Sequence, residues 1–421
     1  MIIRREHFRY LLMLAGVVLY LFLNAQAIDG DFNLFYQSSR LFAHGLNPYG
    51  LAGHPENPNI GGFTYPPIAL FVVWLPSLLP LGFALIAWTL LCLLMLTASL
   101  YLWMDLFLGE TPDLPEYALA LVLTATAPTA WSFWLHQLTM PVLFAATLAT
   151  WLWVRRRHAF GSGLAAGLML LKPHLTLLAL ALFALRIPER KKFLLGFLIV
   201  ALLPWVPFLT SAKRLGYLRD LKTSVMHHTN HLYSRDDQSI PAQFYKAVVL
   251  TPDEHAFLKR DNVRYAANFM SELPFVRRMN AFKSKAFAAV FAVWTLWILL
   301  KKRIHWPTDV ALALAVTLLF TSYSHLYDGL MLMPLVLLVG IELAGLYGLA
   351  LISCIAFFLN LALTFAIPFN PTMNTDIYWE RTSYTALGYA VVLAALWAWS
   401  RRPLVKTAFE THPLQTKEVQ S

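Results

Sequence analysis

The chain has few charged residues and almost no cysteine. Asp, Glu, Lys and Arg make up only 13% of its 421 residues, whereas hydrophobic residues make up 58%. Long apolar runs recur to the end of the sequence, and a soluble core cannot bury so many of them. The composition therefore predicts an all-α polytopic integral membrane protein, because only helices or closed barrels cross a bilayer.

The sequence lacks the patterns typical of disulfide frameworks, metal sites and nucleotide-binding loops. The two cysteines, Cys92 and Cys354, lie in apolar runs, which argues against a disulfide framework and a thiolate metal site. The 13 histidines show no pair with metal-ligand spacing. Phosphate loops, dinucleotide fingerprints and fixed-period repeats are also absent. The formal charge of +10 comes largely from short basic clusters beside apolar runs, so it indicates membrane topology and not a nucleic-acid partner.

These basic clusters predict which ends of the spans face the cytoplasm. They are residues 4–5, 155–157, 190–192, 301–303 and 401–402. With all five inside, the predicted external segments are residues 27–62, 212–284, 323–328 and 369–383. We expect one transmembrane catalytic domain over residues 1–405, a cytoplasmic polar tail over residues 406–421, and both termini in the cytoplasm. The first apolar run is followed by Ala25-Gln26-Ala27, which resembles a signal-peptidase site, but its length favours a retained anchor.

Two stretches do not fit simple spans. Four apolar segments separate the first external loop from the internal cluster at 155–157, although an odd number of crossings is needed there: 64–80, 82–104, 117–134 and 137–154. The Pro-rich segment 64–80 is the candidate for an irregular one. Residues 161–186 are interrupted by Lys172-Pro173, and proline disfavours helical geometry at the residue before it. This pattern predicts two half-helices with Lys172 in a buried or hydrated cavity.

Ionisable residues within or beside spans are candidates for function, because they are costly unless paired or hydrated. Asp31 directly follows the first apolar run, where a carboxylate can serve a substrate whose tail lies in the lipid. The alternative is an acid that caps a juxtamembrane helix. Lys172 and His174 flank Pro173, and a cationic pair there suits a phosphate leaving group. The alternative is a lysine that snorkels to the interface.

Weaker candidates lie in loops. His325 and Asp328 fall in a short polar segment that forms an ordinary turn, unless His325 helps to bind phosphate or tunes Asp31. Asp236 and Asp237 form either a divalent-cation site or, the favoured interpretation, a solvated turn. His136-Gln137, at the expected outer end of a span, is a polar feature of the same kind.

The order of several motifs resembles glycosyltransferase family 87. An acid with Phe and Tyr follows the first span, and residues 45–49 read Gly-Leu-Asn-Pro-Tyr. The later motifs are Phe-Thr-Tyr-Pro-Pro at 63–67, His-Gln at 136–137, Lys-Pro at 172–173 and Gln-Ser at 238–239. The resemblance runs from about residue 29 to about residue 340. It implies a GT-C bundle of about 10–12 transmembrane or re-entrant helices with external juxtamembrane elements.

The resemblance implies a membrane glycosyltransferase that takes a sugar from a polyprenyl-phosphate donor. A mannose-like hexose, or a pentose, would pass with inversion to a lipid or glycan acceptor on the outer face of the cytoplasmic membrane. Asp31 would be the general base, and we expect Lys172, His174 and His325 to bind the donor phosphate. The expected substrate contacts are Tyr36, Asn47, Tyr65, Gln137, Gln238, Ser239 and Asp328. We assign no metal ligands and no required cofactor, although a divalent cation is compatible with this chemistry.

Two alternatives share the polytopic form. A ligase or polymerase for lipid-linked polysaccharide would use Arg and His in the long loop, where the chain carries Arg219, His227, His228, His231 and Arg235. A flippase or transporter would place charges in a membrane cavity. No inverted repeat is visible in the hydropathy, which argues against the transporter.

Overall fold

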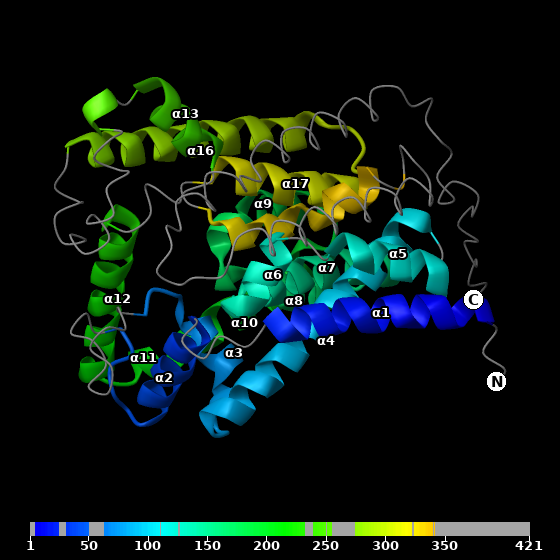
Figure 1. Cartoon of the computed structure of the whole chain (residues 1–421). Coiled ribbons are helices and arrows are strands. Elements are labelled where there is room, and N and C mark those ends of the chain that lie inside the picture. The colour runs from blue at the N-terminus through cyan, green and yellow to red at the C-terminus, as the bar shows by residue number, and fades with distance from the viewer. Residues whose placement is uncertain are drawn as a thin grey trace, which may run out of the picture.

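The apolar runs form helices, because a backbone in hydrocarbon must satisfy each N–H and C=O within its own segment. The computed structural model describes residues 5–24, 31–49, 63–109, 111–124, 127–231, 239–249, 251–254, 274–321, 324–339 and 341. Within these residues every regular element is helical. Helix α4 packs against α7, and α16 lies beside α17 (Figure 1). The chain is therefore an all-α polytopic membrane protein.

Among the described residues, three helices are long and apolar enough to cross a membrane. They are α4 (Leu81–Leu108), the continuous run Arg190–Leu209, and the segment Arg277–Leu300 of α16 (Pro274–Leu300). The run Arg190–Leu209 comprises α10 (Arg190–Leu202), η3 (Leu203–Trp205) and α11 (Val206–Leu209).

Shorter helices complete the bundle. The N-terminal ones are α1 (Arg5–Asn24), α2 (Asp31–Ala43), α3 (Pro67–Ser77), α5 (Leu114–Thr124), α6 (Ala127–Trp134) and α7 (Thr139–Arg156). The central ones are α8 (Ala159–Leu168), η1 (Met169–Leu171), η2 (Pro173–Leu175) and α9 (Leu177–Arg186). The later ones are α12 (Ala212–His231), α13 (Ile240–Phe244), η4 (Tyr245–Val249), α17 (Trp306–Phe320) and η6 (Leu326–Leu332).

The break predicted at Lys172-Pro173 is confirmed. Helix α8 ends in the 3₁₀ turn η1, Lys172 adopts a non-helical conformation (φ −137°, ψ 75°), and η2 and α9 follow. One irregular segment was expected between residues 64 and 154, and the structure is irregular at two places there. Segment 64–80 contains only the 11-residue α3, and α6 meets α7 at an angle of 118°. The sequence did not predict this bend, which falls at His136-Gln137.

Helices α8 and α10 pack backbone to backbone. A Cβ atom on Gly163 would lie 2.0 Å from the carbonyl oxygen of Phe193, and one on Gly196 would lie 2.2 Å from that of Phe160. Small residues allow such close approach in membrane proteins, where no hydrophobic force drives helices together. This contact fixes α8, and with it the break that carries Lys172.

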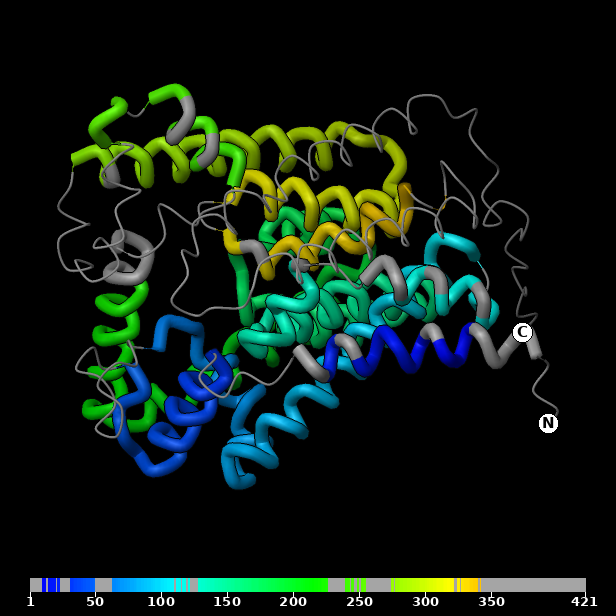
Figure 2. The backbone as a smooth tube through the Cα atoms, viewed as in Figure 1, coloured from blue at the N-terminus to red at the C-terminus, as the bar shows by residue number. Residues whose placement is uncertain are grey.

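Helix α12 lies beside the segment that follows α2 (Figure 2). Asn47 Nδ2 donates to Asp220 Oδ2 at 2.6 Å, and the Tyr217 hydroxyl donates to the Gly45 carbonyl at 3.0 Å. The Ser224 hydroxyl donates to the Tyr49 carbonyl at 2.9 Å. The start of the predicted external segment 212–284 is therefore tied to the predicted external segment 27–62.

Some predicted elements lie outside the described residues. They are the external segment 369–383 and the cytoplasmic tail 406–421. The acids at 236–237, Gln238 and Arg235 lie outside them too.

Candidate active site

A buried ion pair joins the helix break to the segment after α17. Lys172 Nζ lies 2.9 Å from Asp328 Oδ1, and the two side chains are 3% and 1% exposed. Thr139, the first residue of α7, accepts a hydrogen bond from Lys172 Nζ and donates one to Asp328 Oδ1, each at 2.9 Å. The backbone N–H of His325 donates to Asp328 Oδ2 at 3.0 Å. Both oxygens of Asp328 are therefore satisfied, as a buried carboxylate requires.

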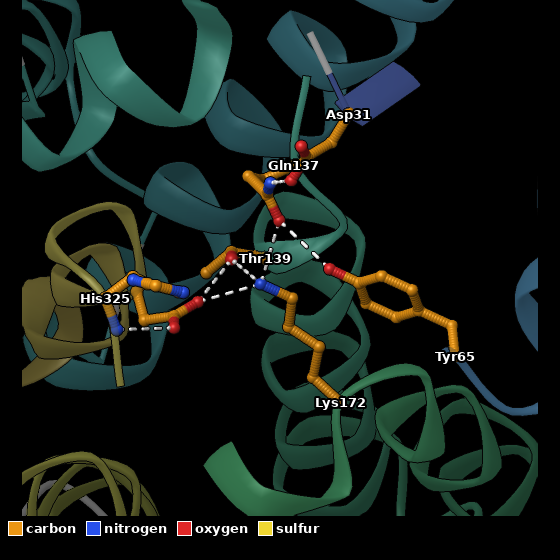
Figure 3. A network of polar contacts seen from close by, with 7 residues as sticks. Asp31, Tyr65, Gln137, Thr139, Lys172 and His325 are labelled. Carbon is orange, nitrogen blue, oxygen red and sulfur yellow. Dashed lines mark hydrogen bonds and ion pairs between the residues drawn. The ribbon is translucent and has the colours of Figure 1, made fainter. Parts of the chain in front are cut away.

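Gln137 links this ion pair to Asp31. Its Oε1 accepts hydrogen bonds from Lys172 Nζ at 3.1 Å and from the Tyr65 hydroxyl at 3.4 Å, while its Nε2 donates to Asp31 Oδ2. Figure 3 shows the Gln137 side chain between Asp31 and Lys172. One polar network therefore connects residues that are far apart in the sequence.

Local structure explains why Gln137 points into the network. His136 sits at the bend with φ +55°, a conformation that is uncommon for residues other than glycine. Trp88 Nε1 donates to the His136 carbonyl at 3.2 Å, and the Thr89 hydroxyl is 3.2 Å from His136 Nε2. Both partners lie on α4, so that helix holds the bend in place.

Asp31 occupies the first turn of α2, where the helix dipole favours a negative charge. Burial raises the pKa of its carboxyl group above the usual range. The charge of Lys172 and the hydrogen bond from Gln137 oppose this rise, and the charge of Asp328 adds to it. A carboxyl group with a raised pKa is better suited to take a proton at neutral pH than an ordinary aspartate.

The network unites four predicted site residues around Lys172: Asp31, Tyr65, Gln137 and Asp328. His174 and His325 lie close enough for their charges to act on Asp328. We expected Lys172 to bind the donor phosphate, yet in this structure its three N–H groups donate to protein oxygens.

Other predicted residues lie apart from the network. The Tyr36 hydroxyl donates to the Leu79 carbonyl at 2.9 Å and ties α2 to the end of α3. Asn47 contacts Asp220 on α12 and also accepts from the backbone N–H of Tyr49. Ser239 is buried at the start of α13.

Sequence reasoning missed Thr139. A threonine at a helix start carries no special signal, because such residues usually cap the helix or bond to a nearby carbonyl. The nearest available clue was its position two residues after Gln137 and two residues before Pro141.

A cavity of about 430 Å³ lies elsewhere, between α16 and α17. Its lining is almost wholly apolar, apart from Lys301, Thr308 and Asp309 at one end, and it includes no residue of the network. It lacks the converging polar groups that mark a catalytic site. Among the described residues, no cluster of three or more His, Cys, Asp or Glu side chains is placed to hold a metal ion.

Comparison with known families identifies the chain. The sequence profile of glycosyltransferase family 87 matches residues 63–334. The chain belongs to glycosyltransferase family 87. Neither the curated proteins nor the solved structures provide a match.

The family 87 match and the network overlap only in part. Tyr65, Gln137, Lys172 and Asp328 lie inside the matched region, whereas Asp31 precedes it. The family therefore establishes a membrane glycosyltransferase, and the placement of Asp31 rests on the contacts in the structure.

Proposed function

We propose that this family 87 protein transfers a mannose-like hexose, or a pentose, from a polyprenyl-phosphate donor to a lipid or glycan acceptor. The reaction takes place on the outer face of the cytoplasmic membrane, and Asp31 is the general base. The observation that carries the proposal is the position of Asp31, a carboxylate that follows the first apolar helix and is held by Gln137.

The reaction needs one proton transfer and one displacement. The acceptor hydroxyl gives its proton to Asp31 while its oxygen bonds to the anomeric carbon of the sugar. The bond between that carbon and the phosphate oxygen breaks, and polyprenyl phosphate leaves with the electron pair. Attack from the face opposite the phosphate inverts the anomeric centre.

The departing phosphate needs positive charge more than it needs an acid, because phosphate is already a good leaving group. His174 and His325 serve this role in the proposal. Both act electrostatically on the same buried carboxylate, so they lie at the same end of the network. The chemistry then needs no metal ion, although a divalent cation could supplement the histidines.

The basic clusters support the proposed external placement of the site. Lys301, Lys302 and Arg303 precede α17, and Arg155 and Arg156 end α7. With these ends in the cytoplasm, the opposite ends of α7 and α17 face outward. Those opposite ends carry Thr139 and lead to Asp328.

The family match favours a transferase over a ligase, a polymerase or a flippase. The test is to offer purified protein the same labelled sugar on a short-chain polyprenyl phosphate or on a nucleoside diphosphate, with a membrane-lipid extract as acceptor. We expect label to move into lipid or glycan only from the polyprenyl-phosphate donor. Transfer from the nucleotide donor alone, or from neither donor by folded protein, would refute the proposal.

A further inference from the structure

The ammonium group of Lys172 has no N–H left for a ligand. A lysine carries three N–H donors. Those of Lys172 reach Gln137 Oε1 at 3.1 Å, Thr139 Oγ1 at 2.9 Å and Asp328 Oδ1 at 2.9 Å. The residue is 2% exposed, and its ammonium also lies 4.6 Å from the centre of the Tyr327 ring. Protein groups therefore surround the ammonium group and hold it in a fixed position.

The position of this charge dictates how the Gln137 amide is turned. An ammonium can only donate, so the amide atom that faces Lys172 must be the carbonyl oxygen. The amide NH₂ group then faces Asp31, whose ionised carboxylate can only accept. The Tyr65 hydroxyl adds a second donor to the same carbonyl oxygen. If the amide were flipped, its NH₂ group would face the ammonium group of Lys172 and its carbonyl oxygen would face the carboxylate of Asp31. Neither pair could form a hydrogen bond.

The amide holds one oxygen of Asp31 and leaves the other open. Gln137 Nε2 donates to Oδ2, and no hydrogen bond from the described part of the chain reaches Oδ1. Asp31 as a residue is only partly buried. A base that is fixed through one oxygen can present the other to an acceptor hydroxyl in a constant direction.

We propose that Gln137 is a positioning residue for Asp31, and that Lys172 acts through Gln137 as its anchor instead of binding the donor phosphate. The inference rests on the proposed function, because it assigns these roles within the transfer reaction. It separates the polar groups into two sets: Asp31 and Gln137 for the acceptor proton, and His174 and His325 for the phosphate.

Few charged groups act on Asp31. Lys172 and Asp328 act on it from the helix break and from η6. His174 and His325 act on Asp328 and not directly on Asp31. The ring of His136 contacts Phe32, the neighbour of Asp31. Helix α3 carries no charged residue, and Arg40 on α2 bonds to Tyr36.

The first test is the pH dependence of kcat/KM for Gln137→Glu. The new carboxylate keeps the size of the amide and an acceptor for Lys172, but it places a second acid against Asp31. Two such carboxyl groups share a proton and titrate as a pair, so Asp31 becomes an ionised base only at higher pH. We expect the acid limb to move up by at least about one pH unit, with the rate recovering at high pH. A substrate contact or a packing role would lower the rate equally at every pH.

Two further variants separate positioning from general damage. Gln137→Met removes the donor to Asp31 without adding a charge, and it should also move the acid limb upward while kcat falls. Thr150→Val is the matched control, because it deletes a buried hydroxyl of α7 that bonds only to the Ala146 carbonyl. The control should keep the wild-type profile. An unmoved acid limb in both Gln137 variants would overturn the positioning role.

The role of Lys172 is tested by inhibition with short-chain polyprenyl phosphate. The double variant Lys172→Met with Asp328→Leu removes both charges together, which buried pairs tolerate better than the loss of one. We expect kcat to fall while the inhibition constant changes by less than about twofold. A phosphate ligand would lose a charge-assisted bond, and the constant would rise at least about tenfold. Wild-type protein that transfers no sugar would refute the proposed function itself, before any variant is compared.

Discussion

Two Lys–Asp pairs in the described part of the chain have different surroundings. Lys301 and Asp309 are 2.6 Å apart, with side chains 12% and 4% exposed, and they are eight residues apart in the sequence. Asp309 also accepts from the backbone N–H of His305 and so fastens the start of α17. Lys172 and Asp328 are 156 residues apart and are joined through Gln137 to Asp31.

The comparison shows that a buried ion pair alone does not mark an active site. The Lys301 pair is completed by a helix start and by the Trp297 ring, 4.3 Å from its ammonium group. The Lys172 pair continues through polar side chains to Asp31, a residue that is only partly buried. In the proposed mechanism, the connection to Asp31 separates the Lys172 pair from the structural pair at Lys301.

The largest effect on folding is expected for Lys172→Met. The substitution leaves the Asp328 carboxylate buried without its cation, which costs about 3–5 kcal/mol. The apparent melting temperature in detergent should fall steeply, and transfer should be lost with it. A stable Lys172→Met protein with full activity would show that the pair does not organise the site.

A smaller effect is expected for Lys301→Met. Its ammonium is more exposed, and Asp309 keeps its bond to the His305 N–H, so the loss should be roughly 1–3 kcal/mol. The melting temperature should drop moderately, while kcat/KM measured below that temperature stays at the wild-type value. A Lys301→Met protein that folds normally but transfers no sugar would break the distinction between the two pairs.

The smallest perturbation is a change of pH in the wild-type protein. The pKa of Asp31 is raised by burial, and only the ionised carboxylate can accept a proton. Transfer should therefore be present at pH values above this pKa and be lost as the pH falls through it. The acid limb of kcat/KM should lie above the ordinary aspartate value of about 3.9. A limb at or below that value would contradict a raised pKa at the base.

The sequence predicted the fold class and the family, and several of its candidate site residues meet in one polar network. Long apolar runs leave little choice but membrane helices, and Pro173 marks the break in its span. Polar and ionisable groups beside spans are costly unless they are paired or hydrated. This cost made four residues candidates for function: Asp31, Gln137, Lys172 and Asp328.

The contacts between these residues could not be predicted from the sequence. Nothing in the local pattern indicates that Lys172 pairs with Asp328, because the pairing depends on how α7, α17 and the helix break pack together. The bend at His136 was missed for the same reason, since Trp88 and Thr89 of α4 hold it. The role of Thr139 depends on its hydrogen bonds to Lys172 and Asp328, which lie far from it in the sequence.

The most direct measurement compares Asp31→Asn with Asp309→Asn in labelled sugar transfer from a short-chain polyprenyl-phosphate donor. Both variants turn a partly or fully buried carboxylate into an amide of the same shape. Loss of the base should lower kcat of Asp31→Asn by about 10²–10⁴-fold without changing its folding. The Asp309→Asn protein should keep the wild-type rate while it remains folded. Equal transfer by wild type and Asp31→Asn would contradict the account.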